Sequence, residues 1–145
     1  MEKLKNTLML LFGLAILPFS LFSETPKVVS DSSLEASATA SQSWLNVVDK
    51  GHYPESWSQA SAIMKLSIPR DEWVQILTKT RKPLGSVVSR QVVDQRVAKN
   101  PHGLPAGNYI VMFYKTVFSS KQKANELVTL YLEDGEWRVL TYQVS

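Results

Sequence analysis

Three acidic residues are candidates for acid–base chemistry in this chain. Asp49 lies near the end of a predicted helix, and Asp94 and Glu126 lie on predicted strands. A carboxyl group buried by the fold has a raised pKa, and such a group can exchange a proton at neutral pH. Structural ion pairs imitate these sites because they also perturb pKa values. An enzyme of this kind therefore needs an inward carboxylate that has no structural partner.

Arg90 lies among valines early in a predicted strand, where alternation allows it to face inward or outward. An inward arginine must be paired, and its planar guanidinium can hold a carboxylate through two hydrogen bonds. We predict a structural pair between Arg90 and Glu126 across the sheet. A bound anion is the alternative inward partner, and a surface arginine is the alternative interpretation.

Aromatic side chains are the second group of candidate functional residues, because they build either a hydrophobic core or a ligand pocket. Helical spacing favours a core role for Trp44, Trp57 and Trp73, with Trp137 on the sheet side. A tyrosine combines an apolar ring with a polar tip and suits the edge of a pocket. The candidate pocket residues are Tyr53, Trp57, Arg90, Tyr109, Glu126 and Tyr142.

The familiar catalytic and metal motifs are missing from the sequence. The chain has no cysteine, so disulfides and thiolate metal sites are excluded. His52 and His102 fall in predicted loops, and neither has a second ligand at metal-binding spacing. No nucleophile elbow and no glycine-rich phosphate loop occurs. We therefore predict no catalytic residue, no metal and no cofactor.

Charge gives little indication of a nucleic-acid partner. The formal net charge is +3, and acidic and basic residues are interspersed along the chain. Lys115, Lys121 and Lys123 near Phe118 are only a faint version of the basic and aromatic pattern that binds single strands. We predict no nucleic-acid partner.

The N-terminus has the features of a secretory signal peptide. Lys3 and Lys5 precede an apolar run from Leu8 to Phe22, and small polar residues follow from Ser23. The run is about 15 residues long, shorter than the roughly 20 that span a bilayer as a helix. We expect a signal peptide at 1–23, a flexible tether at 24–33 and one domain at 34–145. The mature protein would be exported, periplasmic or secreted, with membrane contact only through the signal segment before cleavage.

Three helices are expected first in the domain. Ser32 and Glu35 fit a capping box for a helix that runs to about Lys50. A second helix begins at Pro54, with Trp57, Ala60 and Met64 on its inner face. A third has Pro69 at its first position, directs Trp73, Ile76, Leu77 and Thr80 inward, and is ended by Pro83 and Gly85.

Four strands follow the helices. We expect them at Val87–Val97, Tyr109–Phe118, Leu127–Leu132 and Trp137–Val144. The second strand is apolar over most of its length on both faces, which is typical of a central strand that is covered on both sides or partly faces a cavity. Asp134 and Gly135 predict a two-residue hairpin turn. The order predicts an α+β fold, with three N-terminal helices packed on a four-stranded antiparallel sheet.

Several short motifs resemble a known family. They are Trp44-Leu-x-x-Val-Asp-x-Gly51, Tyr53-x-x-Ser-Trp57, Arg81-x-Pro-Leu-Gly85, Ser89-Arg90, Gly107-x-Tyr109, the strand pair around Glu126 and Val128, and Asp134-Gly-x-Trp-Arg-Val139 with Tyr142. The pattern is similar to a secreted bacterial family known as domain of unknown function 4019. The element order also resembles the nuclear transport factor 2-like and cystatin-like cone, which implies a curved sheet and compatibility with a homodimer.

Three functions follow from these observations as hypotheses. The first is an exported, non-enzymatic domain that binds a small apolar or amphipathic ligand or a protein partner in the cell envelope. The second is a cavity enzyme, of isomerase or hydrolase type, that uses a buried carboxylate or tyrosine. The third is a structural or assembly subunit, with a filled core and a large apolar patch.

Overall fold

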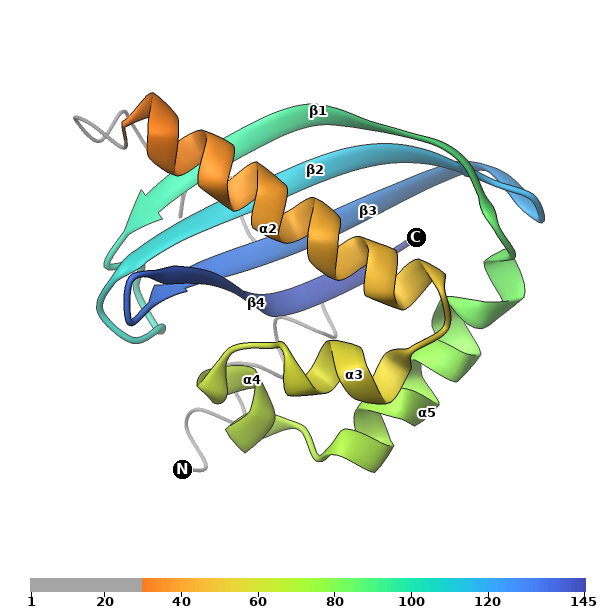
Figure 1. Cartoon of the computed structure of the whole chain (residues 1–145), viewed down its shortest axis with the longest axis horizontal. Coiled ribbons are helices and arrows are strands. Elements are labelled where there is room, and N and C mark those ends of the chain that lie inside the picture. Colours follow the sequence, from red (N-terminus) through yellow and green to blue (C-terminus); the bar gives the residue numbers. More distant parts are fainter. Residues whose placement is uncertain (1–29) are drawn as a thin grey trace.

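The computed structural model describes residues 30–145, so the predicted signal peptide and most of the predicted tether lie outside the described residues. The described part is an α+β domain in which the helices precede the sheet (Figure 1). Its elements are α2 (Asp31–Asp49), α3 (Tyr53–Ser58), α4 (Ala62–Ser67), α5 (Arg70–Thr80), the 3-10 helix η2 (Lys82–Leu84), β1 (Val87–Lys99), β2 (Asn108–Phe118), β3 (Lys121–Glu133) and β4 (Glu136–Val144).

The four strands form one antiparallel sheet in the order β1-β2-β3-β4. Figure 1 shows a curved sheet with α2 crossing one of its faces, while α3, α4 and α5 gather beyond β4. Asp134 and Gly135 make the predicted tight turn, with φ of 50° and 82°. These positive angles match the turn type whose twist suits a hairpin. The predicted α+β class and antiparallel sheet are therefore confirmed.

The helix count differs from the prediction. Four α-helices are present in residues 30–145, because the predicted second helix is divided into α3 and α4. The backbone N–H of Ser61 donates to the carbonyl of Val139 in β4 at 2.8 Å. The Ser61 hydroxyl also accepts from the N–H of Met64 at 3.1 Å and so caps α4. This contact with β4 interrupts the helix after Ser58.

Two predicted boundaries also differ. Helix α2 begins at Asp31 with Ser30 as its N-cap, so the capping box predicted at Ser32 is not formed. Strand β3 begins at Lys121, well before Leu127, because the polar residues at its start pair with β2. Glu126 therefore lies within a strand whose two faces have different environments.

The main core lies between the helices and the sheet. Trp44 and Trp73 are buried, with ring centroids 6.2 Å apart, and Trp44 also contacts Tyr142 at 5.5 Å. The indole N–H groups of Trp44 and Trp73 both donate to Ser56, to its carbonyl and its hydroxyl respectively. The predicted core role of both tryptophans is confirmed, whereas Thr80, predicted to point inward, is exposed.

A second, smaller core lies on the opposite face of β2. Tyr109 and Ile110 are both buried, and successive strand residues point to opposite faces. Tyr109 packs with Ala98 and Leu140, and its hydroxyl donates to the carbonyl of Pro105 at 2.6 Å. The expectation that this strand is covered on both sides is confirmed for Tyr109–Met112.

None of the helices within residues 30–145 is both long enough and apolar enough to cross a membrane.

Candidate functional site

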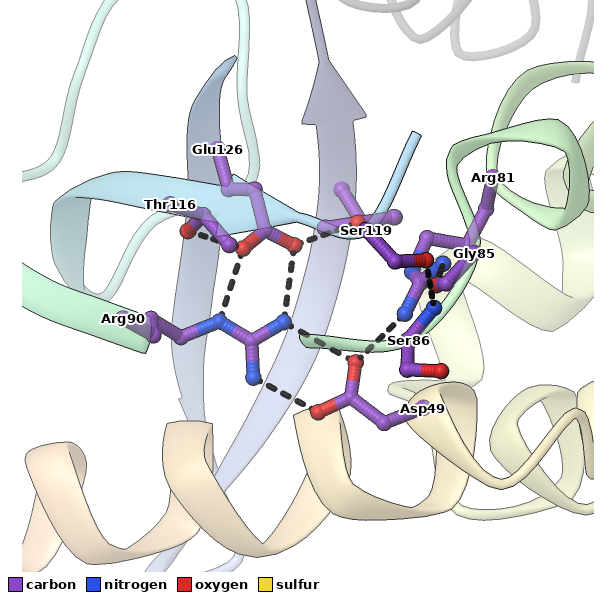
Figure 2. A network of polar contacts seen from close by, with 9 residues as sticks. Asp49, Arg81, Gly85, Ser86, Arg90, Thr116, Ser119 and Glu126 are labelled. Atoms are coloured by element: carbon purple, nitrogen blue, oxygen red, sulfur yellow. Dashed lines mark hydrogen bonds and ion pairs between the residues drawn. The ribbon is translucent and has the colours of Figure 1, made fainter. Parts of the chain in front are cut away.

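A buried carboxylate, that of Glu126, lies at the centre of a polar network (Figure 2). It accepts hydrogen bonds from Arg90 Nε at 2.7 Å and Arg90 Nη2 at 3.1 Å. The hydroxyls of Thr116 and Tyr142 each donate to it at 2.5 Å. A carboxylate offers about four lone-pair positions, so these four donors occupy its capacity. The predicted pair between Arg90 and Glu126 is confirmed.

Register brings these side chains together. Arg90 of β1 is paired with Thr116 of β2, and Glu126 of β3 lies diagonally from Thr116. Directly paired residues share a face of the sheet, and so do residues spaced by two along a strand. Thr116 is paired with Ala124, which is two residues from Glu126, so the side chains of Arg90, Thr116 and Glu126 all point toward the helices. The predicted inward orientation of Arg90 thus follows from its place in the strand.

Arg90 also binds a second carboxylate, that of Asp49 at the end of α2. Nη1 of Arg90 donates to Oδ2 at 2.7 Å and Nη2 donates to Oδ1 at 2.9 Å. The guanidinium therefore makes a two-point contact with each of two carboxylates, the strongest geometry available to it. The Arg90 side chain is 12% exposed and that of Asp49 is 19% exposed. Arg90 consequently joins α2 to β3 through charged hydrogen bonds.

A second arginine, the buried Arg81, completes the network. Arg81 donates from Nη2 to Asp49 at 3.1 Å and from Nη1 to the carbonyl of Gly85 at 2.7 Å. Its guanidinium lies 4.4 Å from the centre of the Phe118 ring, in cation–π contact. Its buried Nε has no acceptor among residues 30–145. Two cations and two anions thus balance in the buried cluster of Asp49, Arg81, Arg90 and Glu126.

The surroundings stabilise one protonation state of this cluster. Burial opposes the charge on Arg90, but hydrogen bonds to Asp49 and Glu126 outweigh it and raise the pKa of Arg90. Burial, together with the charge and hydrogen bond of Glu126, holds the pKa of Tyr142 well above its ordinary value. Arg90 is therefore a cation and Tyr142 a neutral donor at neutral pH. The cluster holds protons in place and has no free base among its four charged members.

A pocket of about 470 Å³ lies next to this cluster. It is lined by α5 and by all four strands: Ile76, Leu77, Thr80, Val93, Phe113, Tyr114, Asn125, Glu126, Leu127, Tyr142, Gln143, Val144 and Ser145. Most of the lining is apolar. The pocket is therefore suited to a molecule that is largely apolar.

The six predicted pocket residues are not all at this pocket. Glu126 and Tyr142 line it, and Arg90 lies behind them in the network. The other three lie elsewhere. Trp57 donates its indole N–H to the carbonyl of Ile68, Tyr109 belongs to the second core, and Tyr53 is buried in the main core.

Sequence reasoning assigned other roles to Asp49 and Arg81, and it did not single out Thr116. Asp49 is an acid–base candidate in the sequence, and Arg81 appears there only as the first residue of a family-like motif. Their common signal was their place in two of the family-like motifs, Trp44–Gly51 and Arg81–Gly85. Motif membership marked the residues, but only the tertiary fold shows that they meet.

The remaining acid–base and metal candidates have ordinary surroundings. Asp94 forms an ion pair with Arg96 at 2.7 Å. His52 is exposed and lies 3.5 Å from Glu55. Within the described part of the chain, no three histidine, aspartate or glutamate side chains are grouped so that they could hold a metal ion.

The fold and the cluster define a small α+β domain whose buried charges are balanced internally. The profile of a family described as "Protein of unknown function (DUF4019)" matches residues 40–142, and the chain belongs to that family. This range includes all four charged members of the cluster and confirms the resemblance drawn from the motifs. No curated protein matches the sequence.

Proposed function

We propose that this protein is an exported, non-enzymatic domain that binds a small apolar or amphipathic molecule in the pocket beside Glu126. The observation that supports this most is the saturation of the candidate carboxylates. Glu126 has four donors, Asp49 is bonded to two arginines, and Asp94 is paired with Arg96. A cavity enzyme would need one of these groups to be free for proton transfer.

The dimensions and lining of the pocket support a ligand-binding role. Small-molecule sites commonly have volumes of about 300–1,000 Å³, with apolar walls and a few polar groups that set orientation. The pocket of about 470 Å³ lies within that range. The side chains of Ile76 and Val144 would contact the apolar part of a ligand.

The proposed location rests on the N-terminal sequence. The basic residues Lys3 and Lys5 and the apolar run Leu8–Phe22 favour export and cleavage before Glu24. The chain would then work in the periplasm or outside the cell. An amphipathic ligand from the cell envelope is consistent with that location.

Native mass spectrometry tests the proposal directly. The protein is expressed from its full sequence in a bacterial host and purified from envelope extract without organic solvent. We expect the polypeptide to begin at Glu24 and to carry extra mass that is lost on denaturation. That mass identifies the class of molecule in the pocket.

A matched pair of variants places the binding site. Thr80 lines the pocket and Thr78 does not, although both are exposed threonines of α5 bonded to a carbonyl four residues back. Thr80→Trp should weaken binding of the amphipathic dye anilinonaphthalene sulfonate by about tenfold, and Thr78→Trp should leave it unchanged. Equal dye binding by both variants, together with a bare native mass, would contradict the proposal.

A further inference from the structure

Strand β1 presents an open edge of the sheet. The strand order is β1-β2-β3-β4, and Figure 1 shows β1 along the outer border of the sheet. Among residues 30–145, no backbone hydrogen bond outside the helices and the sheet ladder reaches Val87–Val93. The opposite edge differs, because Ser61 donates to the carbonyl of Val139 in β4. The outward backbone groups of β1 are thus available for another strand.

The same stretch exposes apolar side chains. Val88, Val92 and Val93 are 67%, 46% and 49% exposed. The only other large hydrophobic residue so exposed in the described part of the chain is Leu66 on α4. Isolated apolar residues on a surface are ordinary, but a group of valines on an open strand is typical of a surface that becomes covered.

Some of the features that usually protect a free edge are absent from β1, and others are present. Lysine, proline, bulges and inward-pointing charged residues keep free edges from pairing. Val87–Val93 contains no lysine or proline, and its one charged residue, Arg90, is turned inward to Asp49 and Glu126. Register shifts occur at Val88 and Val93, so Ser89–Val92 between them pairs regularly with β2. A regular four-residue stretch of the edge therefore remains between the two register shifts.

The sequence of this edge is nearly symmetric. Val87-Val-Ser-Arg-Gln-Val-Val93 gives the same order of apolar, polar and charged residues from either end, with Arg90 at the centre. An interface between two identical subunits related by a two-fold axis must be complementary to itself. We infer that β1 pairs antiparallel with β1 of a second copy of this chain, with the two-fold axis at Arg90.

In this pairing, apolar side chains of one copy lie opposite apolar side chains of the other, and polar side chains lie opposite polar ones. Val88 of one copy lies opposite Val92 of the other, and Ser89 lies opposite Gln91. Cross-strand pairs of β-branched residues stabilise a sheet. The two Arg90 residues face each other at the axis, and each is neutralised by Asp49 and Glu126 in its own subunit. The buried charge cluster therefore allows an arginine at the centre of a symmetric strand pair.

Sedimentation velocity of the protein purified from envelope extract tests the association. We expect a monomer–dimer equilibrium that depends on concentration. Val92→Lys places a lysine against Val88 twice in each dimer, and should raise the dissociation constant by about tenfold or more. Leu66→Lys makes the same chemical change at the exposed site on α4 and should leave the constant within about twofold. Equal effects of the two variants would overturn the inference.

Cysteine pairing tests the register without disturbing the valines. Because the chain has no cysteine, a single introduced thiol reports one contact. Chains carrying Ser89→Cys and chains carrying Gln91→Cys, mixed and oxidised, should form a disulfide-linked dimer several-fold more than either variant alone. Equal cross-linking in all three samples would overturn the register. A protein that sediments as a monomer up to millimolar concentration would overturn the dimer, leaving the edge to an extended segment of a different protein.

Discussion

Arg90 is the side chain that links the two carboxylates of the charged cluster. Its guanidinium binds two carboxylates that come from a helix and a strand far apart in the sequence. Taking these charges out of water is costly, and the hydrogen bonds repay the cost only when all partners are present. Removing one partner leaves a buried charge without compensation, which commonly costs about 3–5 kcal/mol.

A double-mutant cycle measures the strength of this coupling. Arg90→Met and Glu126→Gln should each destabilise the fold by about 3 kcal/mol, and the double variant should lose less than their sum by about 2 kcal/mol. Urea denaturation gives the three free energies of unfolding. The matched control is Arg138→Met with Glu136→Gln, an exposed pair at 2.6 Å whose losses should add within about 0.5 kcal/mol. Additive losses at the buried pair would show that the two residues act independently.

Tyr142 makes stability depend on alkaline pH. Its folded pKa lies well above the ordinary phenol value of about 10, because burial and then Glu126 oppose the phenolate. Below about pH 10 both states keep the proton and this stability is fully present. Above it the unfolded state loses the proton first, so stability falls as pH rises toward the folded pKa.

The variant Tyr142→Phe isolates that contribution. Above about pH 10 the free energy of unfolding of this variant should fall less steeply with pH than that of the native protein. The difference between the two slopes should be up to about 1.4 kcal/mol per pH unit. The loss of the hydroxyl bonded to Glu126 lowers stability equally at lower pH, so the slopes are the quantity to compare. Urea denaturation at several alkaline pH values supplies them. Parallel curves for the two proteins would be inconsistent with this role of Tyr142.

At the scale of helices and strands, a prediction is accurate where the residues that determine the element lie within or beside it in the sequence. Helix α5 was predicted well because Pro69 and Pro83 bound it, and the β3–β4 turn because Asp134 and Gly135 specify its geometry. The division between α3 and α4 was missed because its cause is distant. Ser61 leaves the helix to bond β4, a contact that no local pattern contains.

The cap on α4 can be tested by removing one oxygen. Ser61→Ala should destabilise the fold by about 1 kcal/mol, since the N–H of Met64 loses its acceptor. Ser58→Ala is the matched control, because the exposed Ser58 hydroxyl only bonds the carbonyl of Pro54 within α3. Thermal denaturation should place Ser61→Ala clearly below both the native protein and the control. Identical melting of the two variants would mean that the cap contributes nothing.

At the scale of the whole molecule, half of the charged cluster was predictable. Arg90 and Glu126 were predicted as a pair because two strands in an antiparallel sheet bring such residues together. Asp49 and Arg81 join them only because the ends of α2 and α5 meet at the sheet, which depends on how the helices pack. For the same reason only Glu126 and Tyr142 of the six predicted pocket residues line the pocket, since α5 and the strands form it jointly.

The balance of two arginines and two carboxylates also constrains the history of the family. No member of this quartet can be replaced alone without leaving a buried charge unmatched, so substitutions must be accepted in compensating combinations. A lineage that gives up Glu126 has to give up the arginine that faces it, or gain another acid nearby. Relatives should accordingly divide into those that retain the whole quartet and those that have exchanged it for an apolar interior.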